Sequence, residues 1–486
     1  MLSVSVYTFG CKLNQLESEA LADAFRRAGF SVAALEESSR ECAAPPDLII
    51  INTCTVTSRS DQKARRVIRK ALRDFPFSCV IVTGCYAALD GEKIAALEEG
   101  RAAEQRLFVS GDKAALLELP VYLASALNDT AARAGRTAAL VARWLMPEET
   151  KNMRGGEGAF RFTPEKFSFH TRAFLKIQDG CDNHCTYCRI RLARGPSVSM
   201  AAAQALEELR ALEAAGYWEA VLTGVNITQY RNSPDDTGGL GGLLRVLLEG
   251  TRTIGIRLSS LEPLAITDEF AEVLAHPRIR PHFHLSAQSG SKTVLGKMGR
   301  AYSGAAVEKA AGLLRSVKGN PFLACDIITG FPGEGEAEFE ETLAMCRNTG
   351  FAWIHAFPYS KRPGTAAYAY AQTVSEEEAM RRVDILTKLA WDGRRNYARS
   401  CVGGVLETLV ESGGGKSPLA RDSGEDQEYG AADAELSCEY CRGLSDNYLR
   451  VLIRCSGKPV PSPGTVLKCE ARALSERAGY DVYVEI

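Results

Sequence analysis

Six apolar segments alternate with helical patterns from about residue 171 onward, and this alternation most restricts the folds open to the chain. The segments are AFLKIQ, EAVLT, GIRLSS, HFHLS, FLACDII and AWIHAF, and the helical patterns between them include 200–215, 303–317 and 336–349. Strands that alternate with helices predict a parallel sheet of the α/β class. Six such units in a row predict an incomplete parallel barrel, whose functional site lies on the loops that follow the strands.

The N-terminal part of the chain repeats a shorter version of this pattern, in which a cysteine follows each of three apolar strands. The segments SVSVYTFG, DLIIINT and CVIVTG lead to Cys11, Cys54 and Cys85, and helical patterns separate them. We therefore predict a second parallel α/β domain, Rossmann-like in its organisation. Because the carboxyl ends of parallel strands share one edge of a sheet, the three cysteines are expected to converge there. The alternative for each cysteine is a buried thiol at a strand end.

A chain of 486 residues is too long for one compact core, so two to four domains are expected. A helical pattern at about 375–398 leads into the short strands VLETLVE, NYLRVLI, TVLKCEA and DVYVEI, which predict a small β-barrel of the oligonucleotide-binding type. The predicted domains are an N-terminal α/β domain over 1–120, a linker over 121–166, the partial barrel over 167–398, and a C-terminal β-barrel over 399–486 with an acidic insertion at 411–436.

The most specific motif, GCDNHCTYC, places Cys181, Cys185 and Cys188 in the loop after the first strand of the predicted barrel. Iron–sulfur cubanes usually take four thiolates, and here no fourth cysteine follows until Cys325. Three ligands leave one iron open, which is what a catalytic metal centre needs. Such an iron can chelate S-adenosylmethionine (SAM) and pass it an electron, which yields a radical that abstracts hydrogen from inert C–H bonds. A zinc site is the competing interpretation, but His184 is badly placed to be its fourth ligand.

Charge and hydropathy narrow the function classes further. A formal net charge of -2 and a pI near 6.4 exclude a globally basic nucleic-acid binder, although not a local basic patch. No run approaches the roughly 18 apolar residues of a membrane span, and the N-terminus MLSVSVYTFGCKLNQ lacks the order of a signal peptide. We therefore expect a cytoplasmic protein with no membrane partner, in which the reducing pool keeps the 15 cysteines out of disulfides.

Ten stretches of the chain have specific sequences that go beyond these patterns. They are TFGCKLNQLESEA, INTCTVTSRSDQKARR, TGCYA, RAFLKIQDGCDNHCTYC, LARGPS, VLTGVNI, IRLSSLEP, HFHLSAQSGSKTVLGKMGRAY, DIITGFPGEGEAEF and FPYSKRPGTAA. In these stretches the chain resembles the radical-SAM methylthiotransferase family, over nearly its whole length. The family combines an N-terminal domain that holds a second cluster, a radical-SAM partial barrel, and a C-terminal TRAM barrel that grips the substrate. The wording around the N-terminal cysteines resembles the branch that acts on N6-threonylcarbamoyladenosine at position 37 of tRNA.

The resemblance implies two 4Fe–4S clusters, an auxiliary one on Cys11, Cys54 and Cys85 and a SAM-cleaving one on Cys181, Cys185 and Cys188. One SAM would methylate a sulfur at the auxiliary cluster, and a second would yield the radical that attacks C2 of the adenine. An aryl C–H carries no acidic proton, so acid–base catalysis would not achieve this insertion, whereas radical cofactors do such work. A sulfur donor and an electron donor of the flavodoxin or ferredoxin type are implied as well.

The same resemblance marks candidates for contacts with SAM. Tyr187, just before the last cysteine of the loop, would lie beside the adenine, with simple packing as the alternative. Gly224 follows the second strand, where radical-SAM barrels usually carry a GGE-like segment; the glutamate is absent, and a tight turn explains the glycine equally well. Ser286, Gln288 and Arg300 follow the fourth strand and would contact the SAM ribose or carboxylate, with loop hydrogen bonding as the alternative.

A basic stripe runs along the helix predicted after the second cysteine, and it consists of Arg59, Lys63, Arg66, Lys70 and Arg73. Steps of four and three residues place these side chains on one face. A charged face is usually only solvated, but this excess of positive charge beside a predicted cluster ligand suits phosphate contacts. We expect it to bind the anticodon stem-loop of tRNA together with the C-terminal barrel, where Tyr448 and Arg450 would stack and contact phosphate.

Two features fit the resemblance less closely. Cys438-x2-Cys441 invites a zinc interpretation, but a zinc ribbon needs a second pair, and the spacing of Cys455 and Cys469 does not supply one, so unpaired thiols are predicted. Arg191 stands where the family commonly has proline, which alters the stiffness of the cluster loop but removes no ligand.

The sequence therefore predicts an enzyme, a tRNA methylthiotransferase that acts at C2 of N6-threonylcarbamoyladenosine. The alternatives within the same chemistry are the isopentenyladenosine base of tRNA and a small-subunit ribosomal protein. From a different class, a non-catalytic iron–sulfur protein that binds RNA or transfers electrons would form no 5′-deoxyadenosine from SAM.

Overall fold

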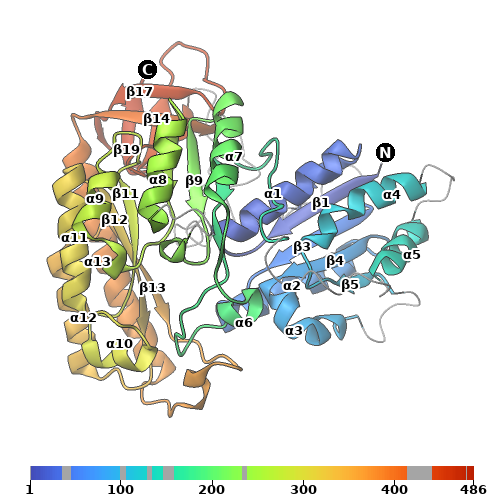
Figure 1. The fold of residues 1–486 in the computed structure, drawn as a ribbon, viewed down its shortest axis with the longest axis horizontal. Helices are drawn as coiled ribbons and strands as arrows, with labels where there is room; N and C mark the ends of the chain where they lie inside the picture. Colours follow the sequence, from blue (N-terminus) through green and yellow to red (C-terminus); the bar gives the residue numbers. More distant parts are fainter. Residues whose placement is uncertain are drawn as a thin grey trace. The chain divides into compact units, whose positions relative to one another are not determined.

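The computed structural model describes residues 2–35, 45–98, 105–127, 134–145, 158–231, 238–412, 440–477 and 479–486. Contacts divide them into two compact units, which Figure 1 shows coloured along the sequence. Unit 1 contains the described residues up to His170 and also the segment Arg189–Pro196. Unit 2 contains Thr171–Cys188 and the described residues from Ser197 onward.

Unit 1 is built on a parallel five-stranded sheet with the order β2-β1-β3-β4-β5. Its strands are β1 (Ser3–Thr8), β2 (Ser31–Ala34), β3 (Leu48–Thr53), β4 (Cys79–Gly84) and β5 (Leu107–Val109). The three strands that precede the predicted auxiliary cysteines are β1, β3 and β4, and they are neighbours in the sheet. The Rossmann-like α/β organisation predicted for this part of the chain is confirmed.

Helices cover both faces of this sheet. On one face α2 (Ser58–Asp74) and α3 (Cys85–Ala95) pack through apolar side chains such as Val67 and Ile68. On the other face α1 (Lys12–Arg27), α4 (Leu119–Leu127) and α5 (Ala134–Leu145) share a core with alternate residues of the same strands. Because successive side chains of a strand point to opposite faces, fully apolar strands such as LIIINT can serve both layers.

The stretch predicted as a linker, 121–166, contributes to this second layer in its described part. Leu123 of α4 and Val141 of α5 are fully buried in the core that α1 shares with the sheet. These helices therefore belong to unit 1 by packing. In AGRTAALVARWL, Thr137 and Val141 are buried, and Leu140, Trp144 and Leu145 pack partly buried against the same core.

Unit 2 contains the six parallel strands that the sequence predicted, in chain order around an incomplete barrel. They are β6 (Ala173–Lys176), β9 (Glu219–Thr223), β10 (Gly255–Leu258), β11 (His282–Gln288), β12 (Phe322–Thr329) and β13 (Trp353–Pro358). The strands form two sheets, β10-β9-β6 and β11-β12-β13, and a parallel bridge between Leu261 and Leu285 links β10 to β11. A short antiparallel pair, β7 (Gln178–Asp179) and β8 (Val198–Ser199), flanks the cysteine loop.

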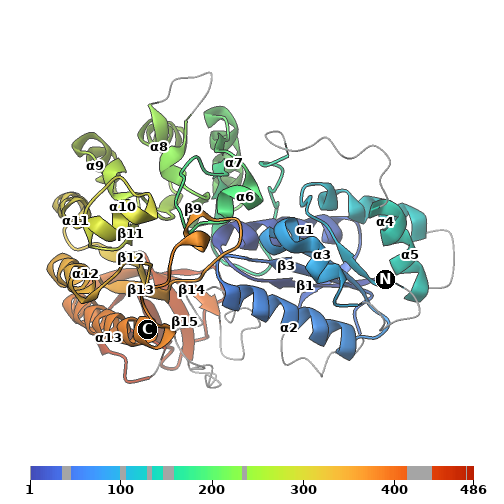
Figure 2. The same cartoon turned by 90° about the horizontal axis from the view of Figure 1, so that it is seen from below.

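The helices of unit 2 lie in an arc outside these strands, as Figure 2 shows. They are α7 (Ala202–Ala214), α8 (Gly239–Gly250), α9 (Asp268–Leu274), α10 (Lys292–Met298), α11 (Gly304–Lys318), α12 (Glu336–Thr349) and α13 (Glu376–Cys401). Side-chain caps fix several helix starts; Thr267 accepts from the amide of Phe270 and Ser375 accepts from the amide of Glu378. Within the described residues, no helix is both long and apolar enough to cross a membrane.

The C-terminal part of unit 2 is a six-stranded sheet with the order β17-β14-β15-β16-β19-β18. Its strands are β14 (Val405–Ser412), β15 (Tyr440–Ser445), β16 (Arg450–Arg454), β17 (Val466–Glu470), β18 (Ala473–Leu474) and β19 (Val482–Glu485). All pairings except β16 with β19 are antiparallel. Beyond β14, the predicted acidic insertion (411–436) and Cys438 lie outside the described residues.

Candidate active site

The central cysteine loop follows β6 and β7, as predicted, and it carries Cys181, Cys185 and Cys188. Thr186 anchors the loop on the end of α10, since its amide donates to the carbonyl of Met298 at 3.0 Å and its hydroxyl to the carbonyl of Lys297 at 2.8 Å. All three thiols are half-buried, and burial raises the pKa of both Cys181 and Cys185. The loop therefore holds three thiols in place and leaves them partly open to a ligand.

Three predicted SAM contacts, Tyr187, Gln288 and Arg300, meet beside this loop. The Arg300 guanidinium donates to the Tyr187 hydroxyl from Nη2 at 2.9 Å and from Nε at 3.3 Å. That hydroxyl in turn donates to Oε1 of Gln288 at 3.2 Å. Gln288 has a φ of 62°, a left-handed conformation that is uncommon for a non-glycine residue and concentrates at functional sites. The three residues thus form one polar network at the carboxyl end of β11.

A carboxylate that the sequence analysis missed, Glu262, joins this network from the loop after β10. Its Oε1 accepts from Arg300 Nη1 at 2.7 Å, from Asn183 Nδ2 at 2.5 Å and from Asn226 Nδ2 at 3.1 Å. Asn183 lies inside the cysteine loop, so Glu262 links that loop to the loops after two other strands. The signal in the sequence was an acid directly after a predicted barrel strand, in SSLEP.

Gly224 and Ser286, the other two predicted SAM contacts, are placed by packing and by a backbone hydrogen bond. Gly224 packs against Gln178, and a Cβ at this position would lie 2.8 Å from the Gln178 side-chain oxygen. In the same loop, the backbone amide of Asn226 donates to the side-chain oxygen of Gln178 at 2.9 Å. Ser286 contributes its backbone, since its carbonyl accepts from the Tyr302 hydroxyl. The tight-turn alternative for Gly224 therefore agrees with its packing.

Polar side chains also meet across the three strands β10 to β12. Ser260, just beyond β10, pairs with Nδ1 of His284 at 2.8 Å, and Nε2 of His284 lies 3.2 Å from Asp326 on β12. Alternate residues of a strand share a face, so His282, His284 and Ser286 lie on one side of β11. Gln288 is the last residue of the same strand.

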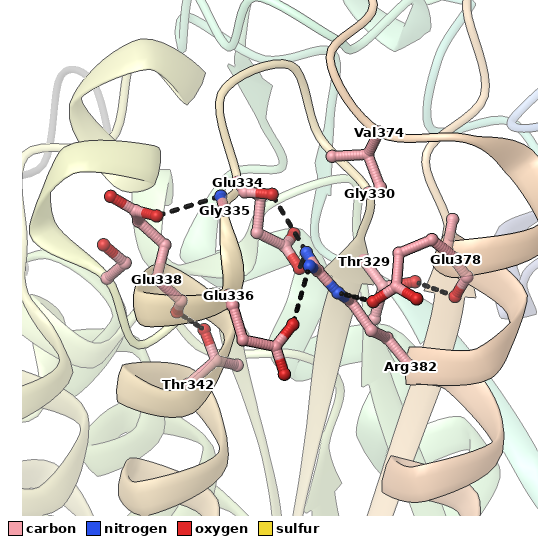
Figure 3. A network of polar contacts seen from close by, with 12 residues as sticks. Thr329, Gly330, Glu334, Gly335, Glu336, Glu338, Thr342, Val374, Glu378 and Arg382 are labelled. Carbon is pink, nitrogen blue, oxygen red and sulfur yellow. Dashed lines mark hydrogen bonds and ion pairs between the residues drawn. The ribbon is translucent and has the colours of Figure 1, made fainter.

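The loop after β12, residues 330–335, is tied to the start of α13 by a single arginine, as Figure 3 shows. Arg382 donates from Nη1 to the Glu334 side chain and to the Glu334 carbonyl, both at 2.9 Å. It also donates to Glu378 at 2.8 Å and to Glu336 at 3.2 Å. Both Arg382 and Glu334 are buried. One cation therefore fixes a loop at the functional edge of the barrel.

The three predicted auxiliary cysteines lie at equivalent places in unit 1. Cys11 caps α1, Cys54 directly follows β3, and Cys85 begins α3. Burial and the neighbouring thiols of Cys11 and Cys85 raise the pKa of Cys54 to about 12. The predicted convergence at one edge of the sheet is thus what the structure contains.

Two glycines permit this convergence. Gly10 has a φ of +101°, and a Cβ there would lie 2.6 Å from Cβ of Cys54. Gly84 has the same φ, and a Cβ there would lie 2.2 Å from the carbonyl oxygen of Thr53. Only glycine tolerates both the left-handed backbone and the close approach. The turns that carry Cys11 and Cys85 can therefore pack directly against the turn that carries Cys54.

The basic stripe lies on α2, outside the helix face that is buried in the core. Arg59, Arg66 and Arg73 are exposed, whereas Lys63 and Lys70 are half-buried. Lys63 Nζ stands 5.3 Å from the ring centroid of Phe9, two residues before Cys11. The stripe thus approaches the segment before Cys11 through Lys63, and its three arginines are exposed to solvent.

Tyr448 and Arg450 lie in and after the turn between β15 and β16. The Tyr448 ring stacks on His282 with centroids 3.9 Å apart, and the Arg257 guanidinium lies 5.1 Å from its centroid. Its ring is therefore engaged inside unit 2, which conflicts with the expectation that it stacks on RNA. Arg450 is half-exposed, and its backbone amide donates to Asp481 at 2.7 Å.

The side chains of both triads are thiols, which are the usual ligands of iron–sulfur clusters. Among the described residues, no group of three or more His, Cys, Asp or Glu side chains could hold one metal ion. The thiolates of a cubane bind separate irons, so they need not surround a common point. Each triad offers three thiols at one edge of a parallel sheet with at least one thiol accessible, which fits a cubane with an open iron. Cys441 is buried in the C-terminal sheet, and its predicted neighbour Cys438 lies outside the described residues.

The chain is similar in sequence to two protein families and to curated proteins. Residues 175–346 match the radical SAM superfamily, and residues 3–103 match the uncharacterized protein family UPF0004. The threonylcarbamoyladenosine tRNA methylthiotransferase MtaB of Treponema pallidum (strain Nichols) is 40% identical over 451 residues, covering 85% of this chain and 91% of that protein. The MtaB of Bacillus subtilis (strain 168) is 34% identical over 460 residues, covering 93% and 91%. Among solved structures, the radical S-adenosylmethionine methyltransferase TsrM of Kitasatospora setae has a TM-score of 0.48 and 17% identity over 75% of this chain and 76% of that chain.

Proposed function

We propose that this chain, which belongs to the family of radical-SAM tRNA methylthiotransferases named MtaB, inserts a methylthio group at C2 of N6-threonylcarbamoyladenosine at position 37 of tRNA. The observation that carries the proposal is the second cysteine triad. SAM cleavage needs only the central loop, so three further cysteines at neighbouring strand ends of a separate sheet call for an additional task. Handling the sulfur that is inserted is such a task.

The radical SAM domain implies SAM and a 4Fe–4S cluster, and we place that cluster on Cys181, Cys185 and Cys188. A second 4Fe–4S cluster would lie on Cys11, Cys54 and Cys85. When bound, these groups supply a carbon-centred radical and an activated sulfur, with one SAM consumed for the radical and one for the methyl group.

The side chains around the central loop would bind and orient SAM. Arg300 carries a fixed positive charge, which suits the SAM carboxylate. Tyr187 is held by Arg300 and Gln288, and burial raises the pKa of its phenol, so the group stays neutral. Glu262 holds Arg300 and Asn183 in place. The chain thus pre-positions its ligand-binding groups before any substrate arrives.

The tRNA would be held chiefly through its phosphates. The exposed arginines of the α2 stripe, Arg59, Arg66 and Arg73, are suited to the backbone of the anticodon stem-loop. Arg450 supplies a further cation on the C-terminal sheet, which would act as the TRAM barrel of the family. Tyr448 is not part of the proposed interface, because its ring packs on His282. An electron donor of the flavodoxin or ferredoxin type and a cytoplasmic location complete the proposal.

A reconstituted assay tests the reaction directly. Anaerobically reconstituted protein would be incubated with SAM, a reductant, sulfide as the sulfur source and tRNA that carries threonylcarbamoyladenosine, and 5′-deoxyadenosine and modified nucleosides would be quantified. We expect both 5′-deoxyadenosine and the 2-methylthio nucleoside. Formation of 5′-deoxyadenosine with no methylthio product from this tRNA would contradict the proposed function.

A further inference from the structure

The short helix α6 (Ile190–Arg194) follows the central cysteine loop in sequence, yet the segment Arg189–Pro196 packs as part of unit 1. Its two ends contact elements that carry all three predicted auxiliary cysteines. The inference drawn from these contacts rests on the proposed function, because it concerns the cluster placed on those cysteines.

Arg189 contacts the residue after one of these cysteines and the helix that begins at another. Its Nη1 donates to the hydroxyl of Thr55, the residue after Cys54, at 3.4 Å. The same atom donates at 3.0 Å to Asp90, where α3 is kinked five residues after Cys85. The Arg189 side chain is 8% exposed, and its buried Nε finds no hydrogen-bond partner among the described residues. A buried donor without an acceptor is costly, and sulfur atoms of a bound cluster would offer acceptors.

Arg194, at the other end of the helix, contacts the element that starts at the remaining cysteine. It donates to Glu17 of α1 at 2.9 Å and to Asn14 Oδ1 at 3.0 Å. The amide nitrogen of Asn14 donates in turn to the carbonyls of Phe9 and Thr53, which lie in the turns before Cys11 and Cys54. Arg194 is 6% exposed and Glu17 is 1% exposed. The buried guanidinium of Arg194 is thus linked, through the side chain of Asn14, to the turns before Cys11 and Cys54.

The positive charge of Arg194 would affect the reduction potential of a cluster on these cysteines. Three thiolates make a 4Fe–4S cluster anionic, and each electron it accepts increases the negative charge. A buried cation nearby stabilises the reduced form more than the oxidised form, because Coulomb interactions are strong where water is excluded. Net charge and hydrogen bonds to the sulfurs are the factors that set the potential of such clusters. Glu17 offsets part of the charge of Arg194, but Lys113 lies 2.6 Å from the same carboxylate and leaves the group with a net positive charge.

We infer that the segment after Cys188 completes the auxiliary cluster site, and that Arg194 is a positioning residue that fixes the cysteine-bearing turns and raises the cluster's reduction potential. The segment that begins immediately after the last ligand of one cluster would thereby be built into the site of the other.

The test uses full-length protein in which Cys181, Cys185 and Cys188 are all replaced by alanine, so that only the auxiliary cluster can form. Iron content and an EPR-monitored redox titration would be compared for this parent and for Arg194→Gln, Arg194→Lys and Arg191→Gln in the same background. Arg191→Gln is the matched control, since it removes a cation from the same helix. Thermal unfolding of each variant reports whether the fold is retained.

We expect Arg194→Gln to shift the midpoint potential to more negative values, Arg194→Lys to shift it less, and Arg191→Gln to leave it near that of the parent. Loss of iron in Arg194→Gln alone, with the fold retained, would also support the inference. Full iron content with an unchanged potential in Arg194→Gln, or an equal shift in Arg191→Gln, would overturn it while the proposed function stands. A parent that binds no cluster would overturn the auxiliary cluster itself, and the inference with it.

Discussion

Arg257 and Glu219 form a two-pronged ion pair in which neither side chain is exposed to solvent. Nε and Nη2 of Arg257 donate to the two carboxylate oxygens of Glu219 at 2.6 and 2.7 Å. The same guanidinium donates at 3.0 Å to the carbonyl of Asp446, in the turn between β15 and β16. Arg280 also lies 3.3 Å from Glu219. Arg257 on β10 thus binds both Glu219 on β9 and the turn between β15 and β16.

Replacing Glu219 by glutamine should destabilise unit 2 strongly. The variant removes the carboxylate that pairs with buried Arg257 and one of the two carboxylates that pair with Arg280. Breaking a buried pair in this way costs roughly 3 to 5 kcal/mol in free energy of unfolding. Denaturant unfolding followed by circular dichroism measures the loss. Glu272→Gln, on the exposed side of α9, is the control and should change stability by less than about 0.5 kcal/mol. Equal stability of the two variants would contradict the role assigned to Glu219.

A second carboxylate, Glu213, should make stability depend on pH. It accepts from the backbone amides of Arg252, Thr253 and Ile254 at 2.9, 2.5 and 2.9 Å. Burial opposes ionisation, but these bonds outweigh it and lower the pKa of Glu213 from 4.5 to about 2. Since the folded pKa lies below the unfolded one, the stabilisation is present above pH 4.5 and is lost as the pH falls towards 2. Glu213→Gln should therefore cost about 1 kcal/mol at neutral pH, after allowance for solvent screening.

The pH dependence of this difference is the measurement. The gap in unfolding free energy between wild type and Glu213→Gln should shrink as the pH is lowered from 6 to 3. A gap that stays constant over this range would show that the ionised form of Glu213 contributes nothing.

Glu262→Gln should weaken SAM binding while leaving the clusters in place. The carboxylate holds Arg300 and Asn183 by charge-assisted bonds, which an amide would replace only in part. A loss of about 10-fold to 100-fold in SAM affinity is expected, as charged hydrogen bonds contribute about 1.5–3 kcal/mol. Equilibrium binding of SAM to reconstituted protein measures it, with iron content as the control. Wild-type affinity would show that Glu262 does not organise the site.

Some of this site could be predicted from the sequence, because its rules act locally. The cysteines follow apolar strands, and parallel topology alone brings Cys11, Cys54 and Cys85 to one edge. The contacts of Glu262 could not be anticipated in the same way, since they join loops after different strands. Nor could the packing of Tyr448 on His282, which depends on how the C-terminal sheet meets the barrel. An exposed tyrosine in a polar turn and a packed one have the same local sequence.

The helix α6 shows the same limit. Its short sequence, IRLAR, gives no sign that it packs with unit 1. The bond from Arg194 to Asn14 spans 180 residues, and only the folded chain brings these groups together. The helices α4 and α5 were not predicted, because the mixed composition of 121–166 was interpreted as a linker.

Cys54→Ser should distinguish the functions of the two proposed clusters in one experiment. Loss of one of three auxiliary ligands should remove about half of the iron and abolish the methylthio product, while SAM cleavage to 5′-deoxyadenosine continues at the other cluster. Cys79→Ser is the matched control, because Cys79 is buried as Cys54 is. Cys79 lies at the start of β4, at the opposite end of the strand from Cys85. Equal iron loss in both variants would contradict the assignment of Cys54.

The identity of the substrate can be measured in cells. The chain would be expressed in a bacterial strain that lacks its own enzyme for 2-methylthio-N6-threonylcarbamoyladenosine, and its tRNA nucleosides would be quantified by mass spectrometry. We expect this nucleoside to reappear with the wild-type chain and to stay absent with Cys54→Ser. Unconverted threonylcarbamoyladenosine despite cluster-loaded protein, or a methylthio group gained only by isopentenyladenosine, would contradict it.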